Sequence, residues 1–364
     1  MPGFRIRRGA CHPLFVFEVG FSIDLERAAD RLPAGVERPV LRHRERSSTP
    51  FEYRPAPLRL SQDLGPAAVP PFAPAPTVDI ILYDFGAVSL SYTIPLGDSP
   101  DDVPALSVAL RGHEPLLADA RKRVTELIGS LGPAVQRPRV AGMVEDYFVF
   151  EITEVEGVAD GASFCADHAE WLARVLRAET GAPSPDEVAD ATQARISYGR
   201  GDVTLVDWDS AFILDPDPGD LRAVLEFANV QLLELRYLDQ QVDRTLERAY
   251  ELLSLRTGWR RTFPSFLAED RRRLSTLQVD SAVLLERVTN ALKFLGEEYL
   301  ARLYRLAAGR LHLAEWDAVI ARKLATVEGI YQKMTDRATV RRMEMLEWVV
   351  ILLIALEVVL TLRG

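Results

Sequence analysis

The sequence predicts an α+β protein: a ferredoxin-like α/β body, then long antiparallel coiled-coil helices, and one C-terminal transmembrane helix. Three observations support this. Short aromatic and β-branched runs alternate with helical segments over the first 214 residues. Apolar residues then recur at heptad spacing, and the chain ends in its most hydrophobic stretch.

The N-terminal unit, residues 1–54, is predicted to be a strand followed by a short helix. Residues 14–19 (LFVFEV) have strand composition, and Asp24 is placed to cap a helix that continues to about Leu32. Arginines before this apolar run give it some likeness to an export signal. Glu18 divides the run and no small-residue cleavage site follows, so we interpret it as the first strand.

Residues 55–77 are predicted to form a linker or a loop draped over the surface. Seven prolines occur between Pro55 and Pro76, and hydrophobic periodicity is nearly absent. Proline lacks the backbone donor that helices and central strands need, so no regular structure is expected here.

Residues 78–214 are predicted to form the main α+β domain. Residues 147–152 (YFVFEI) nearly repeat the first strand and precede a predicted helix over 162–178. A strand over 88–96 leads into a predicted helix that ends near Leu131. Strand-then-helix units that also include adjacent strand pairs favour an α+β sandwich over a doubly wound parallel sheet.

A hairpin is predicted near the end of this domain, between strands at 194–198 and 203–208. The turn residues Gly199 and Gly201 support it. The tetrapeptide at 199–202 also spells a cell-adhesion motif, but a turn explains it better.

Residues 215–343 are predicted to form a helical coiled-coil domain. Acids and prolines at 215–220 favour a helix start, and apolar residues then keep a 4-3 spacing. Asp239 occupies a position of this seam where the pattern expects an apolar residue. There it would set the register of the helices or the choice of partner. The seam residues that we single out are Leu225, Leu232, Asp239, Leu246, Leu324, Val327 and Tyr331. A further seam is predicted between Leu274 and Leu295.

Residues 344–362 are predicted to form a transmembrane anchor in which Glu347, Trp348 and Glu357 are the notable side chains. Such a helix would rise ~28 Å, close to the ~30 Å thickness of the hydrocarbon layer. Basic residues before the helix place the body on the cytoplasmic side. Because Glu357 divides the apolar run, a helix that lies in the interface or packs inside an oligomer is the alternative. In a spanning helix, Glu357 would be hydrated near the far interface or would share hydrogen bonds between protomers.

Composition excludes some classes of protein. A formal net charge of −10 argues against direct nucleic-acid binding, which needs a basic surface. Two cysteines are too few for a disulfide framework.

Two groups of residues were weighed as chemical sites. Cys11, His12, Cys165 and His168 offer a possible zinc ligand set, although nothing brings the two pairs together. Asp207 and Asp209 flank Trp208 and could present two carboxylates beside an aromatic ring, as in a sugar or metal site. A buried cysteine and a surface histidine at the start of a helix is the alternative for the first group. Solvation at the end of a strand is the favoured explanation for the second. No triad, phosphate loop or dinucleotide motif appears, so we expect no catalytic residues and no cofactor.

Several segments resemble the "required for meiotic nuclear division" family, a domain-of-unknown-function family. The C-terminal residues 346–358 (LEWVVILLIALEV) carry most of the resemblance, and residues 80–88 (IILYDFGAV) and the seam at 324–331 add to it. The resemblance implies a membrane anchor, a body facing the cytosol or matrix, and homo-oligomerisation. It implies no catalytic residues.

These observations together predict a membrane-tethered, non-enzymatic scaffold or adaptor that forms homo-oligomers. The alternative is a tethered ligand-sensing or hydrolytic α+β domain. Converging polar residues near Trp208 and Tyr147 would favour the alternative, whereas a broad apolar contact surface would favour the scaffold.

Overall fold

A computed structural model describes residues 3–32, 56–65, 73–254, 272, 275–276, 279 and 298–363. The chain divides into two compact units. The first comprises Met1–Tyr237 with Arg287–Ala314, and the second comprises Leu238–Glu286 with Glu315–Gly364.

The first unit holds every strand that the structure describes. The strands are β1 (Arg5–Glu18), β2 (Ser22–Ile23), β3 (Leu58–Asp63), β4 (Thr77–Leu82), β5 (Ala87–Ser91), β6 (Ile94–Pro95), β7 (Val135–Gln136), β8 (Val144–Glu156), β9 (Arg195–Ile196), β10 (Val203–Val206) and β11 (Ser210–Leu214). The helices that lie wholly in this unit are α1 (Leu25–Ala29), α2 (Asp102–Leu110), α3 (Glu114–Leu131), the short 3-10 helix η1 (Gly132–Ala134), α4 (Gly161–Asp167), α5 (Ala169–Arg177), α6 (Pro185–Gln193) and α9 (Glu298–Arg310). Helix α7 (Gly219–Ser254) begins here and continues into the second unit.

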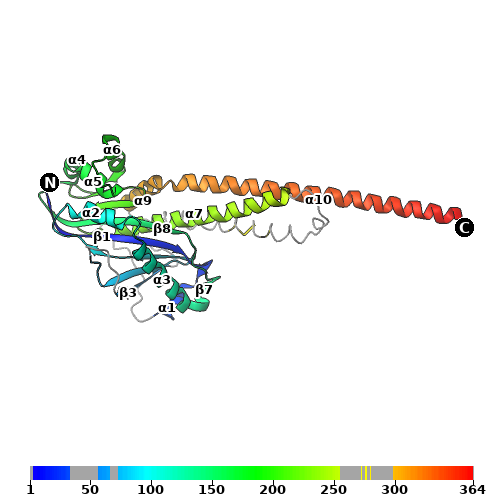
Figure 1. Cartoon of the computed structure of the whole chain (residues 1–364), viewed down its shortest axis with the longest axis horizontal. Helices are drawn as coiled ribbons and strands as arrows, with labels where there is room; N and C mark the ends of the chain where they lie inside the picture. Colours follow the sequence, from blue (N-terminus) through cyan, green and yellow to red (C-terminus); the bar gives the residue numbers. More distant parts are fainter. Residues whose placement is uncertain are drawn as a thin grey trace. The chain divides into compact units, whose positions relative to one another are not determined.

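The main sheet has the strand order β3-β4-β5-β1-β8-β11-β10-β9, and β6 also pairs with β1. All its pairings are antiparallel except β11 with β8. The predicted α+β class is therefore confirmed, but the ferredoxin-like body is wrong because the sheet is far larger (Figure 1). The long strands β1 and β8 form its centre, and further strands extend it on both sides.

The two similar strings noticed in the sequence lie next to each other in this sheet. Strands β1 and β8 pair so that Leu14 is opposite Tyr147 and Cys11 is opposite Phe150. Successive side chains on a strand point to opposite faces, so each string supplies side chains to both faces of the sheet.

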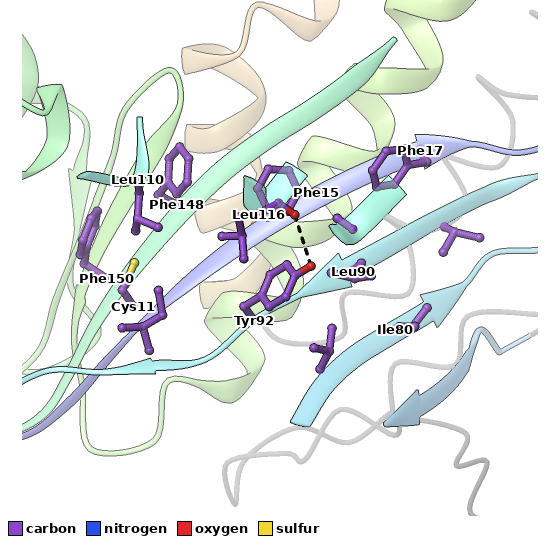
Figure 2. Packing of buried hydrophobic residues seen from close by; sticks show 14 of the residues in the cluster. Cys11, Phe15, Phe17, Ile80, Leu90, Tyr92, Leu110, Leu116, Phe148 and Phe150 are labelled. Carbon is purple, nitrogen blue, oxygen red and sulfur yellow. Dashed lines mark hydrogen bonds between the residues drawn. The ribbon is translucent and has the colours of Figure 1, made fainter. Parts of the chain in front are cut away.

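The hydrophobic core lies on one face, where Phe15 and Phe17 of β1 meet Phe148 and Phe150 of β8. Figure 2 shows part of this packing, in which Leu116 of α3 lies near Tyr92. The Tyr92 hydroxyl donates a hydrogen bond to the Leu116 carbonyl oxygen at 3.4 Å. Helices α2, α3 and α5 supply apolar side chains to this core.

Several local predictions need correction. The proline-rich segment contains β3, because its prolines flank Leu58–Asp63 and none lies inside. The predicted helix that ends near Leu131 is divided into α2 and α3 at Gly112, which has a positive φ of 66°. The predicted helix over 162–178 is divided into α4 and α5 at His168. The predicted hairpin is confirmed by the antiparallel pairing of β9 with β10.

The second unit contains the end of α7 and most of α10 (Leu313–Arg363). Figure 1 shows the two helices running side by side in the same direction, so the predicted antiparallel arrangement is wrong for this pair. Lys323 of α10 contacts Asp239 and Asp243 of α7, both at 2.7 Å. A parallel pair is possible because the long stretch 255–312 separates the two helices in the sequence.

The predicted transmembrane helix at 344–362 needs correction as well. Among the residues that the structure describes, no helix has the length and apolarity needed to cross a membrane. The single-pass anchor is therefore wrong, and so is the localisation inferred from it.

Candidate functional site

The Asp207-Trp208-Asp209 sequence forms the turn between β10 and β11 at one end of the sheet. Asp207 is fully buried, whereas the Trp208 side chain is 60% exposed. The Tyr147 hydroxyl donates hydrogen bonds to the main-chain carbonyl oxygens of Asp207 and Ser210, at 3.1 and 2.8 Å. Tyr147, which belongs to β8, thus holds the turn in place.

Two arginines from separate helices neutralise Asp207. Arg177 of α5 places Nε 2.5 Å from one carboxylate oxygen, and Arg310 of α9 places Nη2 2.7 Å from the other. Asp190 of α6 also contacts both arginines, with Arg310 Nη2 at 2.7 Å. Hydrogen bonds from Arg310 and then Arg177 lower the pKa of Asp190, although its partial burial opposes this. These four residues are called the Asp207 cluster below.

The Asp207 cluster also supports Trp208. The guanidinium carbons of Arg177 and Arg310 lie 5.2 and 5.5 Å from the centre of the Trp208 ring, within cation–π range. Asp209 points elsewhere and pairs with Arg111 at 2.7 Å. The two carboxylates therefore do not share one face, and the solvated strand end favoured from the sequence is wrong for Asp207, which is fully buried. The cluster instead joins three helices to the end of the sheet.

The candidate zinc ligands are not brought together. Cys11 points into the hydrophobic core, and the neighbouring His12 points to the opposite face of the sheet. Cys165 also lies in the core, and His168 packs against Phe4. In the described part of the chain, no group of three or more His, Cys, Asp or Glu residues could hold a metal ion. Burial raises the pKa of both thiols, which disfavours thiolate ligands.

A second polar region, which was not predicted from the sequence, lies between the other face of the sheet and α7. We call it the charged layer. Its members are His12, Glu18, Arg59, Asp79, Glu145 and Glu151 from the sheet strands and Arg222, Glu226, Glu234 and Arg236 from α7.

Ion pairs connect α7 to the sheet at several points along this layer. Arg222 contacts both oxygens of Glu151 at 2.9 and 2.7 Å, and His12 Nε2 lies 3.2 Å from the same carboxylate. Arg236 contacts both oxygens of Glu145 at 2.6 and 2.5 Å. Burial raises the pKa of Glu151, but hydrogen bonds and charge from His12 and Arg222 outweigh it and lower the pKa overall.

Thr93, His12 and Glu151 form a hydroxyl, imidazole and carboxylate series that resembles the parts of a hydrolase triad. The Thr93 hydroxyl oxygen lies 3.3 Å from His12 Nδ1. However, His12 and Glu151 are buried, and the Glu151 carboxylate is already paired with Arg222. The series is therefore part of the ionic contact between the sheet and α7.

A sequence signal for the charged layer existed. Glu18 and Glu151 each interrupt an apolar strand at a position that points away from the hydrophobic core, and His12 lies on the same side. Such residues in central strands indicate a covering element that carries complementary polar groups.

Most of the predicted seam residues are buried or half-buried. Leu225 and Leu232 are buried in the first unit; in the second, Leu246 is half-buried and Leu324, Val327 and Tyr331 are buried. Asp239 is paired with Lys323. Glu347 and Trp348 are exposed on α10, whereas the side chain of Glu357 and nearly all of the seam predicted between 274 and 295 lie outside the described residues.

Comparisons with known proteins place the sheet unit in a family. The family model described as "Uncharacterized protein MJ0711, N-terminal domain" matches residues 8–220. The chain is 23% identical over 221 residues to uncharacterized protein MJ0711 of Methanocaldococcus jannaschii. That alignment covers 60% of this chain and 66%, just under two thirds, of the relative. No solved structure matched the chain.

The match covers β1 through the beginning of α7, which is more than half of the chain. The prediction of a family of unknown function is confirmed, but the match is not to the "required for meiotic nuclear division" family. The chain belongs to the family defined by the N-terminal domain of uncharacterized protein MJ0711.

Proposed function

We propose that this protein is a non-enzymatic scaffold that forms homo-oligomers through the apolar end of helix α10. One observation carries the proposal. Seven consecutive apolar side chains from Trp348 to Ile354 are each between 47% and 68% exposed. Contiguous apolar surface of this kind marks an interaction site in a folded protein.

The run supplies enough apolar surface for association. Seven residues make about two turns of helix, so apolar side chains cover the whole circumference. A helix that is apolar all round is normally buried. Burying each such side chain fully contributes ~1.5–3 kcal/mol, which summed over the run can offset the ~4–15 kcal/mol cost of association.

A second copy of the chain is the partner that this surface fits best. Each copy presents the same run at the end of a continuous helix, so two runs can cover each other in a symmetric contact. Upstream on the same helix, Leu324, Val327 and Tyr331 are buried, and Lys323 contacts Asp239 of α7. Association through the apolar run would extend the packing of these buried residues further along α10.

The contacts near Trp208 and Tyr147 support the scaffold over the ligand-sensing or hydrolytic alternative. In the Asp207 cluster, and at Glu145 and Glu151 of the charged layer, the carboxylates pair with arginines. These pairings stabilise the body, and none of them favours a bound substrate.

Light scattering of the full chain in detergent-free buffer tests the proposal. We expect the wild type to be larger than a monomer and a Val350→Asp, Leu353→Asp double variant to be monomeric, because two charges would be buried in the contact. Ala325→Asp is the matched control, since it adds the same side chain at an exposed position on the same helix. All three proteins should melt at similar temperatures. A monomeric wild type, or a double variant that remains assembled, would contradict the proposal.

A further inference from the structure

Among the residues that the structure describes, the charged layer holds more acids than bases. Its carboxyl groups are Glu18, Asp79, Glu145, Glu151, Glu226 and Glu234, and its bases are Arg59, Arg222, Arg236 and His12. The groups come from β1, β3, β4 and β8 on the sheet and from α7. An excess of acids between two packed elements must be balanced, because a buried carboxylate without a partner is costly.

The three guanidinium groups each have a carboxylate within contact distance. Arg222 contacts Glu151, Arg236 contacts Glu145, and Arg59 contacts Asp79 at 2.7 Å. Glu226 instead accepts a hydrogen bond from the Ser89 hydroxyl, which is a neutral group.

Glu18, like Glu226, is a buried carboxyl group of the charged layer. It is 6% exposed, and its Oε2 atom is buried with no hydrogen-bond partner among the described residues. Burial, and then the charge of the nearby Glu234 carboxyl on α7, raises its pKa. Two neighbouring buried carboxyl groups favour a proton on one of them, because burial disfavours the charged form and like charges repel. The pair is therefore expected to hold a proton at the interface between β1 and α7.

We propose that the docking of α7 on the sheet depends on bound protons, one held at Glu226 and one shared by Glu18 and Glu234, so that the helix packs less tightly as the pH rises. The device is independent of assembly through α10. It makes the attachment of α7 to the body sensitive to pH.

The direction follows from linkage between protonation and docking. Burial raises the pKa of Glu226, and burial followed by the charge of Glu234 raises the pKa of Glu18 well above its ordinary value. Burial also raises the pKa of Glu145, despite Arg236. A raised folded-state pKa gives stability that is complete below the ordinary glutamate pKa and is lost as the pH rises through the raised value.

Glu151 sets the lower end of the pH range in which α7 packs tightly on the sheet. Its pKa is lowered, so its contribution is present above the ordinary glutamate pKa and is lost as the pH falls through the lowered value. The two effects together place the strongest docking of α7 at mildly acidic pH.

Thermal melting of the full chain between roughly pH 5 and roughly pH 8 tests the inference. We expect the wild type to melt about 2–4 °C lower, or more, at the higher pH. Glu226→Gln and Glu18→Gln each replace a protonated carboxyl with a neutral group of the same shape, so each should melt higher than the wild type at the higher pH and show a flatter profile. Glu247→Gln is the matched control, because Glu247 is exposed on the same helix; it should follow the wild type.

Hydrogen exchange resolved by segment places the effect in the structure. Protection of α7 relative to α3 should fall with rising pH in the wild type and change less in the glutamine variants. Should a variant fail to fold, the infrared spectrum of the wild type decides: a carboxylic-acid carbonyl band that persists at neutral pH supports the inference. A wild type without that band, or glutamine variants with the full wild-type pH dependence, would overturn it.

Discussion

The buried carboxylate of Asp207 lies 2.7 Å from Nη2 of Arg310, a residue 103 positions away in the sequence. Asp207 follows β10, and Arg310 ends α9. Their contact joins a turn at the end of the sheet to a helix that comes nearly a hundred residues later. Arg177 of α5 completes the arrangement from a third element.

Replacing Asp207 with Asn should destabilise the body strongly. Asparagine keeps the shape but leaves two buried guanidinium groups with less compensating charge, and breaking a buried ion pair typically costs ~3–5 kcal/mol. Urea unfolding followed by circular dichroism measures the loss. The control is Asp209→Asn, which removes a more exposed ion pair with Arg111 and should cost no more than ~1 kcal/mol. Equal losses for the two variants would show that the Asp207 cluster is not a stabilising centre.

Replacing Gly86 with Ala should also destabilise the body, for a steric reason. Gly86 has a φ of 98°, and a Cβ atom there would lie 2.0 Å from the Gly20 carbonyl oxygen. The backbone of both turns would have to move, which should cost more than the ~1 kcal/mol of a positive φ alone. Gly112→Ala is the control, because Gly112 has a φ of 66° and open space around its Cβ position. Comparison of the two melting temperatures separates the collision from the backbone strain.

Replacing Asp239 with Leu should not stabilise the second unit, contrary to what a lone polar residue in a seam suggests. The Asp239 carboxylate pairs with Lys323 at 2.7 Å, and both side chains are partly buried. The hydrogen bonds to Asp239 and Asp243 raise the pKa of Lys323 although burial, the largest single influence, lowers it. We expect a small loss, up to ~1 kcal/mol.

A double-mutant cycle of Asp239→Leu with Lys323→Met measures the coupling between the two side chains directly. The cycle of Asp243→Leu with Lys323→Met is the control, and it should give a smaller coupling because Asp243 is more exposed than Asp239. A rise in melting temperature for Asp239→Leu, together with zero coupling to Lys323, would restore the interpretation from the sequence.

The sequence by itself determined the features that depend on neighbouring residues. Aromatic and β-branched composition located the C-terminal part of β1 and the central part of β8. Asp24 was identified as a helix cap, and its side chain accepts a hydrogen bond from the Arg27 backbone nitrogen. Heptad spacing located apolar positions on α7 and α10 that are buried, such as Leu225 and Val327. Each of these signals acts over a few residues, so it can be read without the fold.

The tertiary structure alone decided the features that depend on distant pairing. The sequence could not show that β1 pairs with β8, that the sheet extends on both sides of them, or that α7 and α10 run in the same direction. It could not show that Asp207 meets Arg310, or that Glu18 meets Glu234, because a charged residue has the same local pattern whether it faces water or a buried partner. Strand pairing and ion pairing join residues far apart in the chain, and the fold alone selects which of many possible partners come within contact distance.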